Sequence, residues 1–371
     1  MHVRATFLLC FALFLVLYVG HHRSFAQNIN REPAVVRSYG YVMPSNHDTQ
    51  TTSAAHRSLA MQHLSAEDFL PRAFATQNTI SAAGSSTYVV RYDNTVRGWG
   101  LAVRVPATAR GIKAVSNAGT FVVALRTNGT VMAWGAPYLS SGEINVPANL
   151  TNVTHVSASG YHTLARKSNG TVVSWGGNSA GQRTVPSGLT GVISVSAGPA
   201  HSLALKSDGT VRAWGCGGGS NFGQCGVPPG LTGVTKIAAG GTHSLALKAD
   251  GTVVCWGDNN KDQCTGAAAI TGATGISAGE FHSAAIIAGG AVIAWGGDNA
   301  YGELAVPDGL TDVIEVSAGS FHTIALKSDG TLVGWGSNSF RQIPTGINTL
   351  FPPTHTPTKT RTSSRTATRT H

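Results

Sequence analysis

The tryptophan residues of this chain recur at a nearly constant interval. All seven are followed by glycine, and neighbouring Trp-Gly pairs lie 35 to 42 residues apart. They are Trp99, Trp134, Trp175, Trp214, Trp256, Trp295 and Trp335. A period of about 40 residues is typical of tandem repeats in which each copy is one supersecondary unit. We therefore expect a unit of about 39 residues that is repeated seven times.

The repeat at 192–215 shows the local pattern. The β-rich runs VISVSAG and HSLALKS are followed by Asp208-Gly209 and then by TVRAWG. An Asp-Gly pair between β-rich runs predicts a two-residue hairpin turn of type I′, in which both central residues have positive φ. Equivalent pairs lie at 93–94, 128–129, 169–170, 250–251, 289–290 and 329–330. Repeated antiparallel hairpins favour an all-β, seven-bladed β-propeller over a parallel solenoid, whose coils they would interrupt.

The expected turn also fixes which residues face each other across the hairpin. A two-residue loop pairs Trp214 with Leu203. The same register predicts Val123 for Trp134, Leu164 for Trp175, Leu245 for Trp256, Ala284 for Trp295 and Ile324 for Trp335. Because apolar cross-strand pairs stabilise sheets, we expect the tryptophans to be core residues of the blades.

The beginning of the chain has the pattern of a secretory signal. Arg4 precedes an apolar run at 7–19, and small residues at 24 and 26 suit a cleavage site, so residues 1–26 are interpreted as a signal peptide. The run is short for a bilayer span, although an uncleaved anchor helix is the alternative. We expect a secreted or cell-surface protein with no membrane span after signal cleavage.

The remaining segments outside the repeats differ in composition. Residues 27–76 show no repeat and are expected to form a flexible linker. Residues 351–371 are a Thr/Pro/basic tract that cannot bury a core, so a disordered tail is expected. The propeller is assigned to residues 77–350, and residues 343–350 are expected to return and complete the first blade.

The formal net charge of +9 invites comparison with nucleic-acid-binding proteins. Six of the 26 basic residues lie near the chain ends. These are Arg4, Arg23, Lys359, Arg361, Arg365 and Arg369. Without them, 20 basic residues face 17 acidic ones and the balance is only +3. We therefore expect no nucleic-acid partner for the repeat region.

The phrase AGxxH[ST]LALKSDGTVxxWG, read with small variations at 197–215, 239–257 and 318–336, resembles the regulator-of-chromosome-condensation repeat family. The resemblance covers roughly residues 79–348 and implies a seven-bladed propeller. The short units and the Val-Pro linker are most similar to secreted bacterial β-lactamase inhibitor propellers. Guanine nucleotide exchange, known in the family, is a weaker expectation because the units leave no room for the projecting hairpin that serves it.

Four cysteines remain after Cys10, which lies in the signal. Three pairings are possible, and the spacing favours Cys216–Cys225 and Cys255–Cys264, each nine positions apart within one repeat. A zinc site needs closer pairs such as CxxC.

Histidines occupy one repeat position, at His162, His201, His243, His282 and His322. Equivalent positions on separate blades diverge, whereas metal ligands must converge on one ion. We therefore expect these histidines to be structural residues that fix the corner between two strands. No hydrolase or P-loop motif is present, so we expect neither an enzyme nor a cofactor; a hydrolase or lyase with a shallow central site is the competing class.

The two residues before the histidine vary most between repeats, and they are expected to ring one face. The candidate binding residues there are Phe121, Tyr161, Glu280, Phe281 and Phe321. Exposed aromatics clustered on a face are typical of protein-binding surfaces, although local packing over the blade ends is the alternative. In the inhibitor propellers that the chain resembles, such loops meet the enzyme partner. We expect a monomeric protein-binding module, inhibitor-like or adhesion-like, with carbohydrate binding as the alternative.

Overall fold

The computed structural model describes residues 79–101, 103–135 and 141–344. These residues form seven antiparallel sheets of three strands, each ordered as a simple meander. Blades 1 to 4 are β1 (Ile80–Ala83), β2 (Ser86–Val90), β3 (Val96–Gly100); β4 (Ile112–Asn117), β5 (Phe121–Arg126), β6 (Val131–Gly135); β7 (Val153–Ser159), β8 (His162–Lys167), β9 (Val172–Gly176); and β10 (Val192–Ala197), β11 (His201–Lys206), β12 (Val211–Gly215). Blades 5 to 7 are β13 (Val234–Ala239), β14 (His243–Lys248), β15 (Val253–Gly257); β16 (Gly275–Ala278), β17 (His282–Ile286), β18 (Val292–Gly296); and β19 (Val313–Ala318), β20 (His322–Lys327), β21 (Leu332–Gly336).

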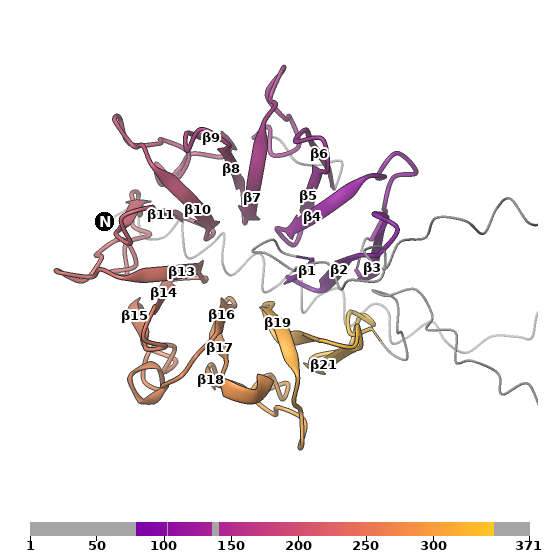
Figure 1. Ribbon diagram of the computed structural model, residues 1–371, viewed down its shortest axis with the longest axis vertical. Coiled ribbons are helices and arrows are strands. Elements are labelled where there is room, and N and C mark those ends of the chain that lie inside the picture. Colours follow the sequence, from indigo (N-terminus) through magenta and orange to yellow (C-terminus); the bar gives the residue numbers. More distant parts are fainter. Residues whose placement is uncertain (1–78, 102, 136–140, 345–371) are drawn as a thin grey trace, which may run out of the picture. The chain divides into compact units, whose positions relative to one another are not determined.

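The blades are arranged radially, with the first strand of each blade nearest the centre (Figure 1). Strand β1 packs against both β4 and β19, so blades 1 and 7 are neighbours. The fold is therefore the seven-bladed β-propeller that the repeat predicts. Two short 3-10 helices, Ala267–Ala269 and Ala288–Gly290, lie in connections.

Serine side chains on the inner strands connect neighbouring blades. Each serine hydroxyl accepts a hydrogen bond of 2.8–3.0 Å from a backbone N–H of the next blade. The serines are Ser81, Ser116, Ser157, Ser196, Ser277 and Ser317, and blade 5 has Ala238 at this position. Because Ser317 accepts from Ala82 N–H, the series also joins blade 7 to blade 1.

Glu315 strengthens this closure from the inner strand of blade 7. Its carboxylate accepts hydrogen bonds from the backbone N–H groups of Thr79 at 3.0 Å and Ile80 at 3.2 Å. Ile343 and Trp99 pack against a hydrophobic cluster that blades 1 and 7 share, formed by Ile80, Ala82, Val89, Ile324, Leu326 and Leu332. The rest of the predicted closing segment, 345–350, lies outside the described residues. In the part of the chain that the structure describes, closure thus rests on side chains of blades 1 and 7 and on Ile343.

The hairpin loops are one residue longer than the predicted two-residue turn. In blade 4 the loop has three residues, Ser207 to Gly209, because Gly209 N–H donates to Lys206 C=O and Lys206 N–H donates to Thr210 C=O. Gly209 has φ of 76°, whereas Asp208 is not among the residues with positive φ. Asp208 Oδ1 instead accepts from Thr210 N–H at 3.0 Å. A type I turn that ends in one left-handed glycine therefore replaces the type I′ turn.

The longer loop shifts the register by one residue and corrects the predicted tryptophan partners. Trp214 pairs with Ser202 and not with Leu203. The observed partners elsewhere are Val122 for Trp134, Thr163 for Trp175, Ser244 for Trp256, Ser283 for Trp295 and Thr323 for Trp335, in place of Val123, Leu164, Leu245, Ala284 and Ile324. A shift by one residue moves a side chain to the other sheet face, so mostly polar residues lie opposite the indoles.

The tryptophans are nevertheless core residues. Those of blades 2 to 7 are only 5–8% exposed. Trp214 belongs to a cluster with Leu164 of blade 3 and Ala204 of its own blade. The hydrophobic core therefore lies between adjacent blades, and each indole helps to fill that space.

The predictions for the chain ends fall on residues that the structure leaves undescribed. The signal peptide at 1–26, the linker at 27–76 and the tail at 351–371 lie outside the described residues. Among the residues that are described, no helix is long and apolar enough to cross a membrane.

Candidate binding face

Two loops of each blade lie at the same end of its sheet. The Gly-to-His loop joins the inner and middle strands, and the post-Trp loop follows the outer strand. In blade 4, His201 pairs with Gly215, and Cys216 N–H donates to Ala200 C=O at 2.9 Å, so the two loops touch. We call the end of the propeller formed by these loops the loop face. The hairpin turns lie at the opposite end, which we call the turn face.

Phe121 does not belong to the exposed part of the loop face. It pairs with Gly135 just as His201 pairs with Gly215, so it occupies the histidine position of blade 2. Its side chain is 1% exposed and packs in the cluster that contains Val153 and Trp175. The prediction that Phe121 is an exposed binding residue is therefore wrong. The loop of blade 2 places its aromatic residue one position later than expected.

Phe281 and Phe321 do lie on the loop face, and they contact each other across blades 6 and 7. Their ring centroids are 5.6 Å apart in a stacked arrangement. Tyr301, from the post-Trp loop of blade 6, packs against Phe321 with centroids 4.9 Å apart. Tyr301 is 47% exposed. These three residues form the aromatic cluster. Tyr301 could not be predicted from the repeat pattern, because the post-Trp loops vary in length.

Glu280 links the two loops that carry the aromatic cluster. Its backbone N–H donates to Gly319 C=O at 3.2 Å. Burial raises the pKa of the Glu280 carboxyl, and the neighbouring Ser320 side chain opposes that shift. This predicted binding residue is only partly exposed, and its backbone holds the two loops together.

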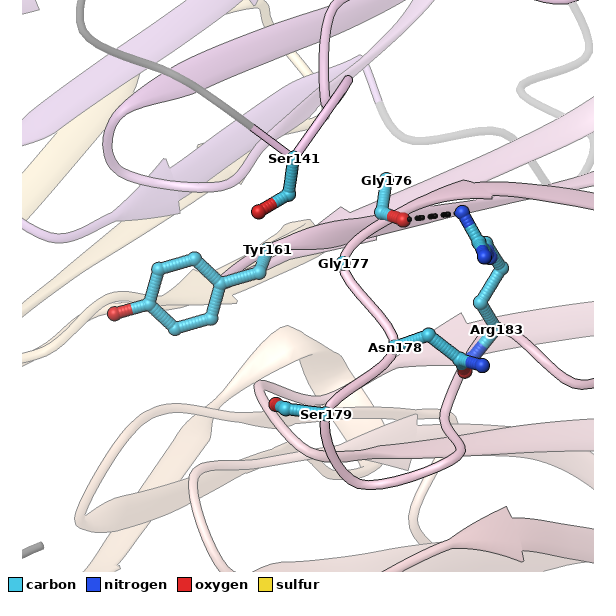
Figure 2. A pocket seen from close by; sticks show the side chains of 7 residues that line it. All are labelled: Ser141, Tyr161, Gly176, Gly177, Asn178, Ser179 and Arg183. Atoms are coloured by element: carbon cyan, nitrogen blue, oxygen red, sulfur yellow. Dashed lines mark hydrogen bonds between the residues drawn. The ribbon is translucent and has the colours of Figure 1, made fainter.

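Tyr161 lies apart from the cluster, on the loop face of blade 3. Its side chain is 53% exposed. It borders an open hollow of about 440 Å³ that is also lined by Ser141, Gly176, Gly177, Asn178, Ser179 and Arg183. In Figure 2 the phenol ring points away from Asn178 and Arg183.

Arg183 and Asn178, two polar residues of this hollow, are hydrogen-bonded within their own loop. The Arg183 guanidinium donates to Gly176 C=O at 2.9 Å, as Figure 2 shows, and Asn178 Oδ1 accepts from Arg183 N–H at 2.9 Å. The Tyr161 ring is therefore the main group that the hollow offers to a ligand.

The repeated histidines connect blades rather than strands of one blade. Each Nε2 lies 2.8–3.1 Å from a serine or threonine hydroxyl of the next blade. The pairs are His162–Ser202, His201–Ser244, His243–Ser283, His282–Thr323 and His322–Thr87. The last pair again joins blade 7 to blade 1. These histidines are structural residues, as expected, but each one bonds to the neighbouring blade and does not fix a corner between two strands of its own blade.

The hydroxyl partners define which ring nitrogen of these histidines carries a hydrogen. Ser283 Oγ donates its hydrogen to Gln263 C=O at 3.1 Å, a carbonyl that also accepts from Trp295 Nε1 at 2.7 Å. Since the hydroxyl has one hydrogen, His243 Nε2 must donate to it. Burial lowers the pKa of His243 to about 4, so the ring is neutral near pH 7 with its hydrogen on Nε2. The same chain of donors recurs from His162 and His201.

Glycine is required beside these rings. A side-chain carbon at Gly319 would lie only 2.6 Å from Cε1 of His322. The Ala-Gly-x-x-His phrase thus reflects close packing of the imidazole against the loop. Among the described residues, no group of three His, Cys, Asp or Glu side chains could hold a metal ion.

Both cysteine pairs favoured by the spacing lie at bonding distance. Cys216 and Cys225 have Cα atoms 6.3 Å apart, and those of Cys255 and Cys264 are 5.2 Å apart. Each bond closes the post-Trp loop of its blade, in blades 4 and 5. Two neighbouring loops of the loop face are therefore restrained covalently.

Comparison with known proteins agrees with this architecture. The regulator of chromosome condensation (RCC1) repeat matches residues 153–182, 192–224, 234–263 and 313–342. These ranges cover blades 3, 4, 5 and 7, each with part of its post-Trp loop. By its fold, the protein is a propeller built from sequence repeats. Four of its seven repeats match the RCC1 repeat. No curated protein sequence matches the chain.

Solved structures show the same fold. The CRINKLY WD40 ectodomain of the Arabidopsis thaliana receptor kinase ACR4 has a TM-score of 0.57 at 22% identity, over 72% of this chain and 98% of that one. The ectodomain of the Physcomitrella patens receptor kinase CR4 scores 0.54 at 19% identity, over 70% and 73%. Prp20p from Saccharomyces cerevisiae scores 0.54 at 18% identity, over 66% and 81%. Similarity at this level concerns the fold.

Proposed function

We propose that this protein is a non-catalytic propeller that binds another protein through its loop face. The observation that carries the proposal is the aromatic cluster of Phe281, Tyr301 and Phe321, which lies on a rigid frame together with the exposed ring of Tyr161. Aromatic side chains supply much of the binding energy at protein interfaces, because they bury large areas with little loss of conformational freedom.

The rigidity of the frame supports this role. Serine and histidine hydrogen bonds join the blades, and two disulfides restrain the post-Trp loops of blades 4 and 5. A surface that is ordered before binding loses less entropy when it binds. Solved relatives support a protein partner as well: Prp20p is described by its binding to Gsp1p and histones, and the receptor kinase propellers are ectodomains.

An extracellular setting fits the same observations. Disulfides persist in oxidising compartments, and the chain begins with a signal-like segment. Inhibition of an enzyme or adhesion between cells are the forms of binding that we favour.

The proposal is tested by capturing the partner from the native extracellular medium with the full chain, and then measuring its affinity for variants. Tyr301→Ala and Tyr161→Ala remove rings that are about half exposed. Each central anchor is expected to contribute about 2 kcal/mol, a loss of about 30-fold in affinity, while the melting temperature changes little. Asp208→Asn, on the turn face, is the matched control and should bind normally. Equal binding by both tyrosine variants would place the interface elsewhere.

Carbohydrate binding is the second candidate, favoured by the open hollow beside Tyr161. An exposed ring next to polar groups can stack on a sugar. In this structure, however, Asn178 and Arg183 are engaged within their loop. A glycan array probed with the wild-type chain and with Tyr161→Ala decides the question: sugar binding that disappears in the variant would support this candidate over the first.

A further inference from the structure

The aromatic cluster offers ring faces at the junction of blades 6 and 7. Phe321 is its central member, since it stacks on Phe281 and touches Tyr301. The three rings come from three separate loops, and the 47% exposure of Tyr301 leaves one side of the cluster open to solvent. The faces of aromatic rings carry partial negative charge, so such a cluster attracts cations as well as apolar groups.

Buried polar contacts hold these loops in place. The backbone N–H of Glu280 donates to Gly319 C=O and so fixes the Phe281 loop to the Phe321 loop. The N–H of Tyr301 donates to the buried carboxylate of Glu303 at 3.0 Å. The ring positions are therefore set before any ligand arrives, and ligand binding need not order them.

The charged side chains in the loops around the cluster are mainly acidic. The post-Trp loops of blades 5 and 6, which Lys261 and Asp298 join, carry Asp258, Asp262 and Asp298 with Lys261 as the basic residue, and the post-Trp loop of blade 7 adds Arg341. Lys261 Nζ lies 2.6 Å from Asp298 Oδ2, and both side chains are solvent-exposed. An exposed ion pair contributes little to stability, so a cation of the partner can replace Lys261 beside Asp298 at a small cost in free energy.

We propose that the aromatic cluster is the anchor site of the loop face and that it takes a lysine or arginine side chain of the partner protein. This inference rests on the proposed function and specifies the chemistry of the partner. The cation lies over the ring faces, and the neighbouring aspartates complement its charge. An uncharged side chain of the partner would place an apolar surface against those carboxylates, with no cation to balance their charge.

The rest of the loop face gives an internal comparison. Among the described residues, the lining of the hollow at Tyr161 includes Arg183 and no carboxylate. The acidic surroundings thus distinguish the cluster from the other exposed aromatic ring, and Tyr161→Ala serves as a control that removes a ring from the same face.

The experiment selects random dodecapeptides displayed on phage against the immobilised full chain. Peptides that bind are synthesised, and their affinities are measured by calorimetry at low and moderate salt. We expect binders enriched in Lys or Arg that lose about 5- to 30-fold in affinity on Phe321→Leu, which keeps apolar bulk but removes the ring. Replacing the selected lysine by norleucine should cost a similar factor, and Tyr161→Ala should cost less than about twofold. Tyr301→Ala repeats the test if Phe321→Leu does not fold.

Peptides that depend on the cluster but lack basic residues, or that bind as well with norleucine, would overturn the inference and leave the proposed function intact. Basic peptides that bind Phe321→Leu and Tyr301→Ala normally would also overturn it. If the selected peptides depend on neither the cluster nor Tyr161, both the inference and the proposed function fail.

Discussion

Replacing His243 by alanine tests whether the histidine series holds the blades together. The side chain is fully buried, and its Nε2 donates to Ser283 Oγ of the next blade at 2.9 Å. Loss of the hydrogen bond leaves a buried hydroxyl without this donor, which costs about 1–3 kcal/mol. The cavity left by the imidazole adds about 2 kcal/mol. We expect a total loss of about 3–5 kcal/mol in the free energy of unfolding.

His243→Phe separates the two contributions. Blade 2 already accommodates Phe121 at the equivalent position, so the ring fits the fold without a polar partner. This variant leaves no cavity and loses the hydrogen bond, so its cost should be about 1–3 kcal/mol.

The assay is thermal and guanidinium unfolding of the full chain at pH 7 without reductant. For a domain of this size, each kcal/mol shifts the melting temperature by about 2–4 °C, so His243→Ala should lower it by about 6–20 °C. A loss below about 1 kcal/mol for His243→Ala would refute the reasoning. A neutral His243→Phe would show that the histidine only fills space.

Three further predictions follow from buried and exposed groups. Burial lowers the pKa of five histidines to about 3–4: His162, His201, His243, His282 and His322. As the pH falls, the unfolded chain therefore takes up protons on these residues before the folded protein does. The free energy of unfolding, measured with guanidinium at a series of pH values, should be greatest near pH 7 and fall by about 1 kcal/mol per histidine per pH unit between pH 6 and 4.5. Glu315, whose pKa burial raises to about 7, acts in the opposite direction by one proton, so Glu315→Gln should make the fall of stability with falling pH steeper; an unchanged profile contradicts the assignment. Phe121→Ala should destabilise the fold by about 3–5 kcal/mol, whereas Tyr161→Ala should leave the melting temperature nearly unchanged, and equal effects would contradict their different burial. Peptide mapping without reductant should link Cys216 to Cys225 and Cys255 to Cys264, and free thiols in protein purified without reductant would count against these bonds.

The repeat itself predicts most of the fold. Seven Trp-Gly pairs at a fixed period specify seven blades, since a single unit cannot bury its indole without a neighbour. The nine-residue spacing of the cysteines predicts their pairing, because the post-Trp loop returns toward the blade that it leaves.

Details that depend on one residue of register could not be predicted in the same way. Asp-Gly suits both a two-residue turn and a three-residue loop, and only the backbone shows that Asp208 keeps negative φ while Gly209 does not. That single shift moves Ser202 opposite Trp214 and places Leu203 on the other sheet face.

The contacts between blades could not be predicted from the local sequence pattern either. The hydroxyl partner lies 40 to 43 residues further along the chain for four of the histidines, and His322 pairs with Thr87 near the start of the propeller. The Ser or Thr that follows each histidine is a signal that could have indicated the first four partners. The Ala-Gly pair of blade 2 predicts a loop position for Phe121, whereas its pairing with Gly135 places it in the strand that follows, at the position of the histidines.

Hydrogen–deuterium exchange of the captured complex tests the central claim most directly. If the loop face binds the partner, amide exchange should slow in the peptides that contain Tyr161, Phe281, Tyr301 and Phe321. The hairpin turns at 207–209, 249–251 and 328–330 should exchange as in the free protein. Protection confined to those turns, with unchanged exchange around Phe281 and Tyr301, would contradict the account.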